Sequence, residues 1–129
     1  MERNPVDTCL SIYFQHFDTG HPYANDLGNL AHQFRQYRRL MMHWGEILPA
    51  ESLLHVPYEG LVAEQECWTR KMLDFIGLPW DERCLDFHLK ERTVGTASKW
   101  QVRQKINRTS VERWRHYDKF VGPLLDLLP

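Results

Sequence analysis

The sequence predicts an α/β fold that is mostly helical and contributes one or two strands to a parallel sheet. The first indication is that apolar residues recur every three or four positions over residues 26–48, which is typical of an amphipathic helix. The second is a short apolar segment at 52–57 between helical segments, as in the strands of buried parallel sheets. The third is composition, because 43% hydrophobic and 12% aromatic residues among 129 predict one packed domain.

The first predicted helix covers residues 5–17. Asn4 precedes Pro5, so it is pushed out of the helical region and can cap a helix that begins at the proline. A polar stripe follows one face at four-residue spacing: Asp7, Ser11 and Gln15. Arg3 lies just before the cap, on about the same side. Solvent exposure is the plainer explanation of a lone mid-helix serine, and a polar ligand along the stripe is the alternative.

The second predicted helix begins after a candidate cap, Asp26, and ends before Pro49. Its apolar face is formed by Leu27, Leu30, Phe34, Tyr37, Met41, Trp44 and Leu48. Its other face carries a basic cluster of Arg35, Arg38 and Arg39, which is either a solvated surface or the contact surface of a helical interaction domain. The strand predicted at 52–57 follows, and Tyr58 stands at its carboxyl end, where ligands bind in open α/β sheets.

The rest of the chain predicts three further helical pieces around a long polar loop. These are a helix at 62–76 stopped by Gly77, a short piece after the candidate cap Asp81, and a final helix opened by a capping box of Thr109 with Glu112. Residues 88–108 lack a long period, and loops of this length are usually functional or disordered. The loop contains hydroxyl groups and cations that suit a phosphate, although a merely solvated basic loop explains them equally: Thr93, Thr96, Ser98, Lys99, Arg103 and Lys105.

The net charge is close to zero, at −1 with 16 Lys and Arg against 17 Asp and Glu. This balance does not indicate binding to nucleic acid or to an acidic membrane surface, and no apolar run is long enough to span a membrane. The three cysteines are widely spaced, which favours reduced thiols and a cytoplasmic protein. No Cys or His pair has metal-ligand spacing, so we expect no metal site.

Several of these segments together resemble sulfotransferases that use 3′-phosphoadenosine 5′-phosphosulfate. The opening RNPVDTCLSIY resembles the 3′-phosphate motif of that family, in which Arg3 and Ser11 would hold the phosphate. VPYEGLV at 56–62 resembles the strand end whose tyrosine, here Tyr58, contacts the adenosine. FIGLPWDERCLDFH at 75–88 and WRHY at 114–117 resemble later segments. TVGTASKWQVR resembles the loop that covers the nucleotide, which implies cofactor contacts from Thr93, Thr96, Ser98, Gln101, Val102, Arg103 and nearby Lys105.

The resemblance is to bacterial members that are fused to helical repeats and allied to tyrosylprotein sulfotransferases. It implies the C-terminal portion of a P-loop-like parallel-sheet fold, with residues 1–129 as a single partial domain that lacks the upstream half bearing the phosphosulfate loop. Transfer of a sulfuryl group to a hydroxyl acceptor, a tyrosine peptide or a small molecule, is the implied activity. The alternative is a non-catalytic domain that binds the 3′-phosphoadenosine nucleotide or a protein.

The same resemblance leaves the catalytic residues unassigned. The acid–base candidates near the expected site are His16, His21 and Glu59, and none matches the base of the family. Gln15 stands where tyrosylprotein sulfotransferases have an arginine, so one phosphate contact is weakened or absent. Because the phosphosulfate half is missing, we expect the isolated chain to be inactive, and unpaired apolar surface favours self-association.

Overall fold

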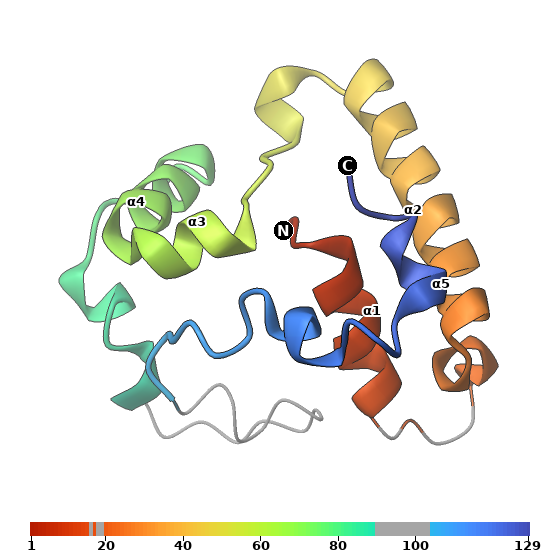
Figure 1. Cartoon of the computed structure of the whole chain (residues 1–129). Helices are drawn as coiled ribbons and strands as arrows, with labels where there is room; N and C mark the ends of the chain where they lie inside the picture. Colours follow the sequence, from red (N-terminus) through yellow and green to blue (C-terminus); the bar gives the residue numbers. More distant parts are fainter. Residues whose placement is uncertain (16, 18–19, 90–103) are drawn as a thin grey trace. The chain divides into compact units, whose positions relative to one another are not determined.

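The computed structural model describes residues 1–15, 17, 20–89 and 104–129, and these residues are mostly helical. They divide into two compact units (Figure 1). The bridge unit combines Met1–Glu2 with Leu54–Thr109, and the core unit combines Arg3–Leu53 with Ser110–Pro129. That the whole chain acts as a single domain stays a prediction.

The core unit begins with α1, Pro5–Phe14, whose predicted cap is confirmed. The side chain of Asn4 accepts hydrogen bonds from the backbone N–H groups of Val6 and Asp7, at 3.0 and 3.1 Å. The helix ends before the expected residue 17, because Gln15 already adopts an extended backbone conformation. A 3₁₀ helix, η1 (Pro22–Asn25), then leads to the next long helix.

The long helix α2, Leu27–Ile47, also confirms its prediction, with the side chain of Asp26 accepting the N–H of Asn29 at 2.7 Å. Its amino-terminal half buries Leu30 and Ala31. The carboxyl-terminal half of the predicted apolar face is instead exposed, including Tyr37, Trp44 and Leu48. The spacing of apolar residues therefore predicted the helix correctly, but it did not predict how much of the apolar face is buried.

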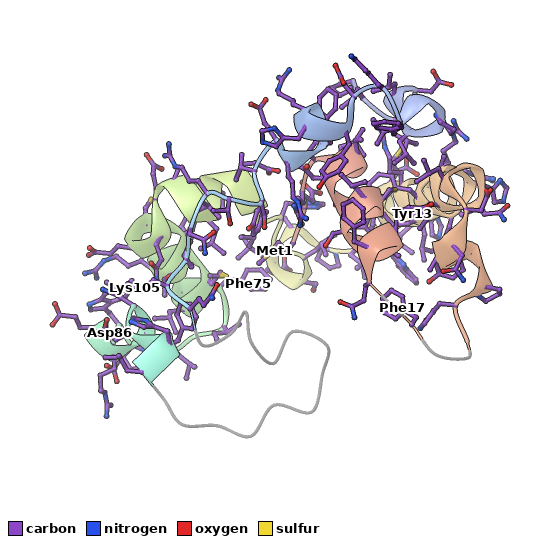
Figure 2. The ribbon with its side chains drawn as sticks, turned by 60° about the horizontal axis from the view of Figure 1, so that its bottom comes forward. Met1, Tyr13, Phe17, Phe75, Asp86 and Lys105 are labelled. Atoms are coloured by element: carbon purple, nitrogen blue, oxygen red, sulfur yellow. The ribbon has the colours of Figure 1, made fainter. Side chains whose placement is uncertain are left out.

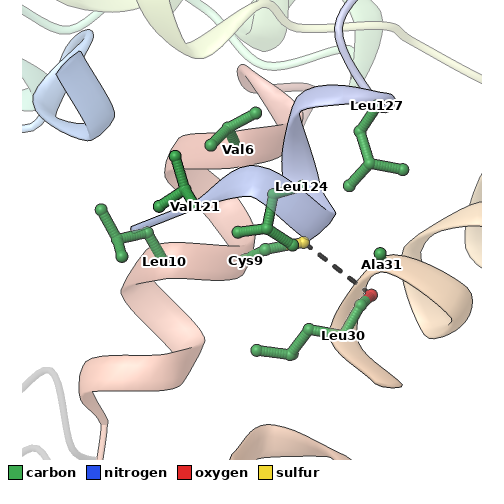
Figure 3. Packing of buried hydrophobic residues seen from close by; sticks show 8 residues of the cluster. All are labelled: Val6, Cys9, Leu10, Leu30, Ala31, Val121, Leu124 and Leu127. Atoms are coloured by element: carbon green, nitrogen blue, oxygen red, sulfur yellow. Dashed lines mark hydrogen bonds between the residues drawn. The ribbon is translucent and has the colours of Figure 1, made fainter. Parts of the chain in front are cut away.

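The hydrophobic core of this unit joins α1, α2 and the last residues of the chain (Figure 3). Its buried members are Val6, Cys9, Leu10, Leu30, Ala31, Val121, Leu124 and Leu127. The Cys9 thiol lies 3.9 Å from the carbonyl oxygen of Leu30, to which it donates a weak hydrogen bond. Burial raises the pKa of this thiol to about 11, because the thiolate is poorly solvated there.

The final helix predicted from a capping box at Thr109 is wrong. Glu112 has a left-handed backbone conformation, with φ of 54°, and its side chain pairs with Arg115 rather than closing the box. A 3₁₀ helix, η6 (Arg113–Tyr117), follows, and then a short helix, α5 (Gly122–Leu125). The predicted stop at Gly122 is thus the beginning of a helix.

The prediction of a strand at residues 52–57 is wrong. Ala50–Ser52, at the end of the core unit, forms a 3₁₀ helix, η2, and the described residues contain only an isolated parallel bridge between Glu2 and Pro57. The N–H of Glu2 donates to the Val56 carbonyl at 2.8 Å, and the N–H of Tyr58 donates to the Glu2 carbonyl at 2.6 Å. The parallel direction agrees with the prediction, but one residue cannot provide a ladder.

The helix predicted at 62–76 is divided in two. Glu64 leaves the helical region and separates α3, Tyr58–Ala63, from α4, Gln65–Phe75. Gly77 follows with φ of +70°, which confirms it as the stop, since glycine adopts this conformation without steric cost. Among the described residues of this unit, the 3₁₀ helices η3 (Glu82–Cys84) and η4 (Phe87–Leu89) follow, and Asp81 caps η3 as expected.

Candidate functional site

The candidate site is the polar face of α1 together with the segment that lies along it. Arg3 donates from Nη2 to the backbone carbonyl of Ser110 at 2.5 Å, and the N–H of Trp114 donates to Asp7 Oδ1 at 2.8 Å. These two bonds hold residues 110–114 beside α1 (Figure 1). Ser11 lies one turn beyond Asp7 and is exposed to solvent. Arg3 thus lies just before the Asn4 cap of α1, whereas Ser11 lies within the helix, and that the two bind one ligand stays a prediction.

Asp7 is the buried charged group of this face, with only 1% of its surface exposed. Its Oδ1 atom accepts the Trp114 N–H, whereas Oδ2 and the Trp114 indole N–H are buried without a hydrogen-bond partner within the described ranges. A buried carboxylate is costly unless hydrogen bonds satisfy it. The sequence predicts Asp7 on the polar stripe, but residue spacing alone does not show that this side chain binds the backbone of Trp114.

Arg113 is a cation at this face that the sequence analysis did not include. Its guanidinium lies over the ring of Phe14, 5.2 Å from the ring centroid. The same ring meets Tyr117 edge-on, with centroids 5.2 Å apart. Phe14 is three residues beyond Ser11 and lies on the same side of α1. Nothing in the sequence spacing connects Arg113 with Phe14, so only the fold could reveal this contact.

The other predicted site residues lie outside the core unit or outside the described residues. Tyr58 is half-buried at the start of α3, and Lys105 is exposed in the bridge unit (Figure 2). Six predicted loop residues fall in the part that is not described: Thr93, Thr96, Ser98, Gln101, Val102 and Arg103. A common nucleotide site formed by all ten residues stays a prediction.

The basic cluster on α2 is partly used within the core unit. Arg38 donates from Nη1 to the carbonyl of Leu127 at 3.2 Å, and Arg39 donates to the side chain of Gln36 at the same distance. Arg35 is exposed. At least one member of the cluster therefore contacts the C-terminal residues, which leaves fewer of its N–H donors for an external partner.

The described part of the chain has neither a metal-site geometry nor a membrane-spanning helix. It contains no group of three or more His, Cys, Asp or Glu residues placed to hold a metal ion. None of its described helices combines the length and apolar character needed to cross a membrane.

Comparison with protein families identifies the class of protein to which this chain belongs. The model of the sulfotransferase family matches residues 1–82, which include α1 and Tyr58. The chain belongs to the sulfotransferase family. The matched residues of this family member do not include the 110–114 segment that lies along α1, so its contribution to the site comes from the structure alone.

A curated relative of this sulfotransferase-family chain is an uncharacterized protein from Aquifex aeolicus (strain VF5). The two are 37% identical over 131 residues, which cover 99% of this chain. The chain spans only 17% of the length of that relative. The activity of a whole protein of this kind is therefore a matter for proposal.

Proposed function

We propose that this chain provides the 3′-phosphate-binding part of a sulfotransferase that uses 3′-phosphoadenosine 5′-phosphosulfate as its donor. The observation that supports the proposal is that Ser11 is exposed on α1 and Arg3 directly precedes the Asn4 cap of that helix, both within the residues that match the sulfotransferase family. Sulfotransferases generally use this donor, and its 3′-phosphate distinguishes it from common adenine nucleotides.

The chemistry of this face suits a phosphate. A planar guanidinium binds phosphate oxygens through charge-assisted hydrogen bonds, and a serine hydroxyl adds a neutral donor. The bond from Arg3 Nη2 to the Ser110 carbonyl limits the orientations of the guanidinium before a ligand arrives. Ser11 is exposed and so accessible to a ligand from solvent. The buried Asp7 carboxylate directs Oδ1 at the Trp114 N–H and not at solvent.

The proposed reaction of the whole enzyme is transfer of the sulfuryl group to a hydroxyl acceptor, such as a tyrosine peptide or a small molecule. That reaction needs a base for the acceptor and cations that neutralise developing charge on the leaving group. We assign neither role to a residue of this chain. Its part is to bind the donor, with Tyr58 as the candidate contact for the adenine ring.

Calorimetric titration of the 129-residue chain tests this proposal. We expect tighter binding of 3′-phosphoadenosine 5′-phosphate than of adenosine 5′-phosphate. Arg3→Ala should reduce the preference more than Ser11→Ala, because a charge-assisted pair contributes ~1.5–3 kcal/mol and a neutral hydrogen bond ~1 kcal/mol. Arg35→Ala is the control, since this arginine is exposed on α2. Equal affinity of the wild-type chain for the two nucleotides would contradict the proposal.

A non-catalytic nucleotide-binding domain is the first alternative, and it predicts the same titration result. A donor-consumption assay on the longer protein separates the two, because only a sulfotransferase consumes the donor in the presence of an acceptor. A helical interaction domain has less support, since Arg38 of its basic cluster is bonded to Leu127 within the core unit.

A further inference from the structure

We propose that Arg113 is a second cation for the same 3′-phosphate, binding it together with Ser11. This inference rests on the proposed function and deepens it, because it assigns a phosphate contact to a residue outside the family match. Arg113 would also supply the positive charge that is missing at Gln15, the position where tyrosylprotein sulfotransferases have an arginine.

The first support is that the backbone around Arg113 is held against α1 at defined points. The Arg3 bond to Ser110 and the Trp114 bond to Asp7 lie on either side of Glu112. Glu112 adopts a left-handed conformation with φ of 54° and ψ of 24°. A non-glycine residue keeps such a conformation only where its surroundings enforce it, and such residues concentrate at functional sites.

The second support is the position of the Arg113 guanidinium. It lies over the Phe14 ring at 5.2 Å from the centroid, where attraction between a cation and an aromatic face holds it. Residues three apart on a helix are surface neighbours, so Phe14 brings the guanidinium to the side of α1 that presents Ser11. The Phe14 ring is in turn held by its edge-on contact with Tyr117.

The third support is the charge balance of this segment. Arg115 is paired with Glu112 at 2.7 Å, and that pairing raises the pKa of Arg115 and lowers that of Glu112. Arg113, by contrast, is exposed, and the described residues provide it with no carboxylate partner. An exposed guanidinium without a carboxylate partner among the described residues, on the side of α1 that carries Ser11, suits a dianionic phosphate.

The test measures nucleotide preference, defined as the ratio of the dissociation constants for adenosine 5′-phosphate and 3′-phosphoadenosine 5′-phosphate. Arg113→Gln removes the charge and keeps most of the side-chain length. It should reduce this ratio by about tenfold, the loss of one charge-assisted contact. Arg113→Lys keeps the charge without the planar fork and should give an intermediate ratio. Arg115→Gln is the matched control, because this arginine is also exposed, belongs to the same segment and already has a partner.

Each outcome decides the inference. A ratio unchanged in Arg113→Gln, in a wild-type chain that prefers the 3′-phosphate, overturns the role of Arg113 and leaves the proposed function standing. An equal loss in Arg115→Gln also overturns it, because the effect would then be that of general positive charge. A wild-type chain without any preference overturns both. Thermal melts of all variants confirm that the exposed substitutions leave the fold intact, and Arg113→Lys provides a second reading if the glutamine variant is unstable.

Discussion

Replacing Leu124 by alanine should strongly destabilise the core unit. The side chain is 0% exposed and belongs to the cluster that joins α1, α2 and α5. The substitution removes three carbon atoms, and at ~0.8 kcal/mol for each buried CH₂ the lost transfer free energy is about 2.4 kcal/mol. A residual cavity adds to this, so we expect a loss of about 3–4 kcal/mol in the free energy of unfolding. That is a large share of the ~5–15 kcal/mol that typical domains possess.

Leu125→Ala provides the matched control, because it makes the same chemical change at the neighbouring position of α5. Leu125 is 38% exposed, so its truncation should cost about 1 kcal/mol. Urea denaturation followed by far-UV circular dichroism measures both values by linear extrapolation. Equal losses in the two variants, or a loss below about 1 kcal/mol for Leu124→Ala, would refute the packing described for this core.

Further predictions concern glycine and thiol positions. Gly60→Ala should destabilise α3, because a Cβ atom there would lie 2.8 Å from Trp68 Nε1, whereas Gly45→Ala meets nothing within 4 Å. The Gly45 variant should gain about 0.5–1 kcal/mol from the higher helix propensity of alanine, and thermal melts compare the two. Stability should fall as the pH rises from 9.0 to about 11, because the unfolded chain loses the Cys9 proton before the folded chain does. Cys9→Ala should remove that alkaline decrease in melts over this range, and an unchanged decrease would contradict its assignment to Cys9. Iodoacetamide at neutral pH should modify exposed Cys67 and spare Cys9 until urea unfolds the chain.

Local signals predicted the beginnings of α1 and α2 and the stop after α4. Asn4, Asp26 and Gly77 act within a few residues of their own positions, so their geometry follows from side-chain chemistry and backbone sterics alone. The strand at 52–57 depends instead on neighbours, and Glu2 is the sole bridge partner among the described residues. An apolar pattern shows that a segment can form a buried strand, but a strand forms only where a neighbouring strand pairs with it.

The candidate site was predicted only in part for a related reason. That Arg3 precedes the cap of α1 and that Ser11 lies within the helix follow from local signals, because Asn4 and Pro5 mark where the helix begins. Arg113 reaches this face because Asp7 competes for the Trp114 N–H that the predicted final helix would have used. Tertiary contacts of this kind override local capping signals, and a sequence without known contacts gives no means of locating them.

The bonds that hold the 110–114 segment have a consequence for the timing of folding in the cell. Arg3 and Ser110 are 107 positions apart, as are Asp7 and Trp114. Ribosomes add ~5–20 residues per second, so roughly 5–20 s separate synthesis of the two halves of each contact. During that interval α1 emerges without the segment that completes its polar face. The polar face of α1 is therefore completed only after residue 114 has been made, and the proposed nucleotide site is incomplete until then.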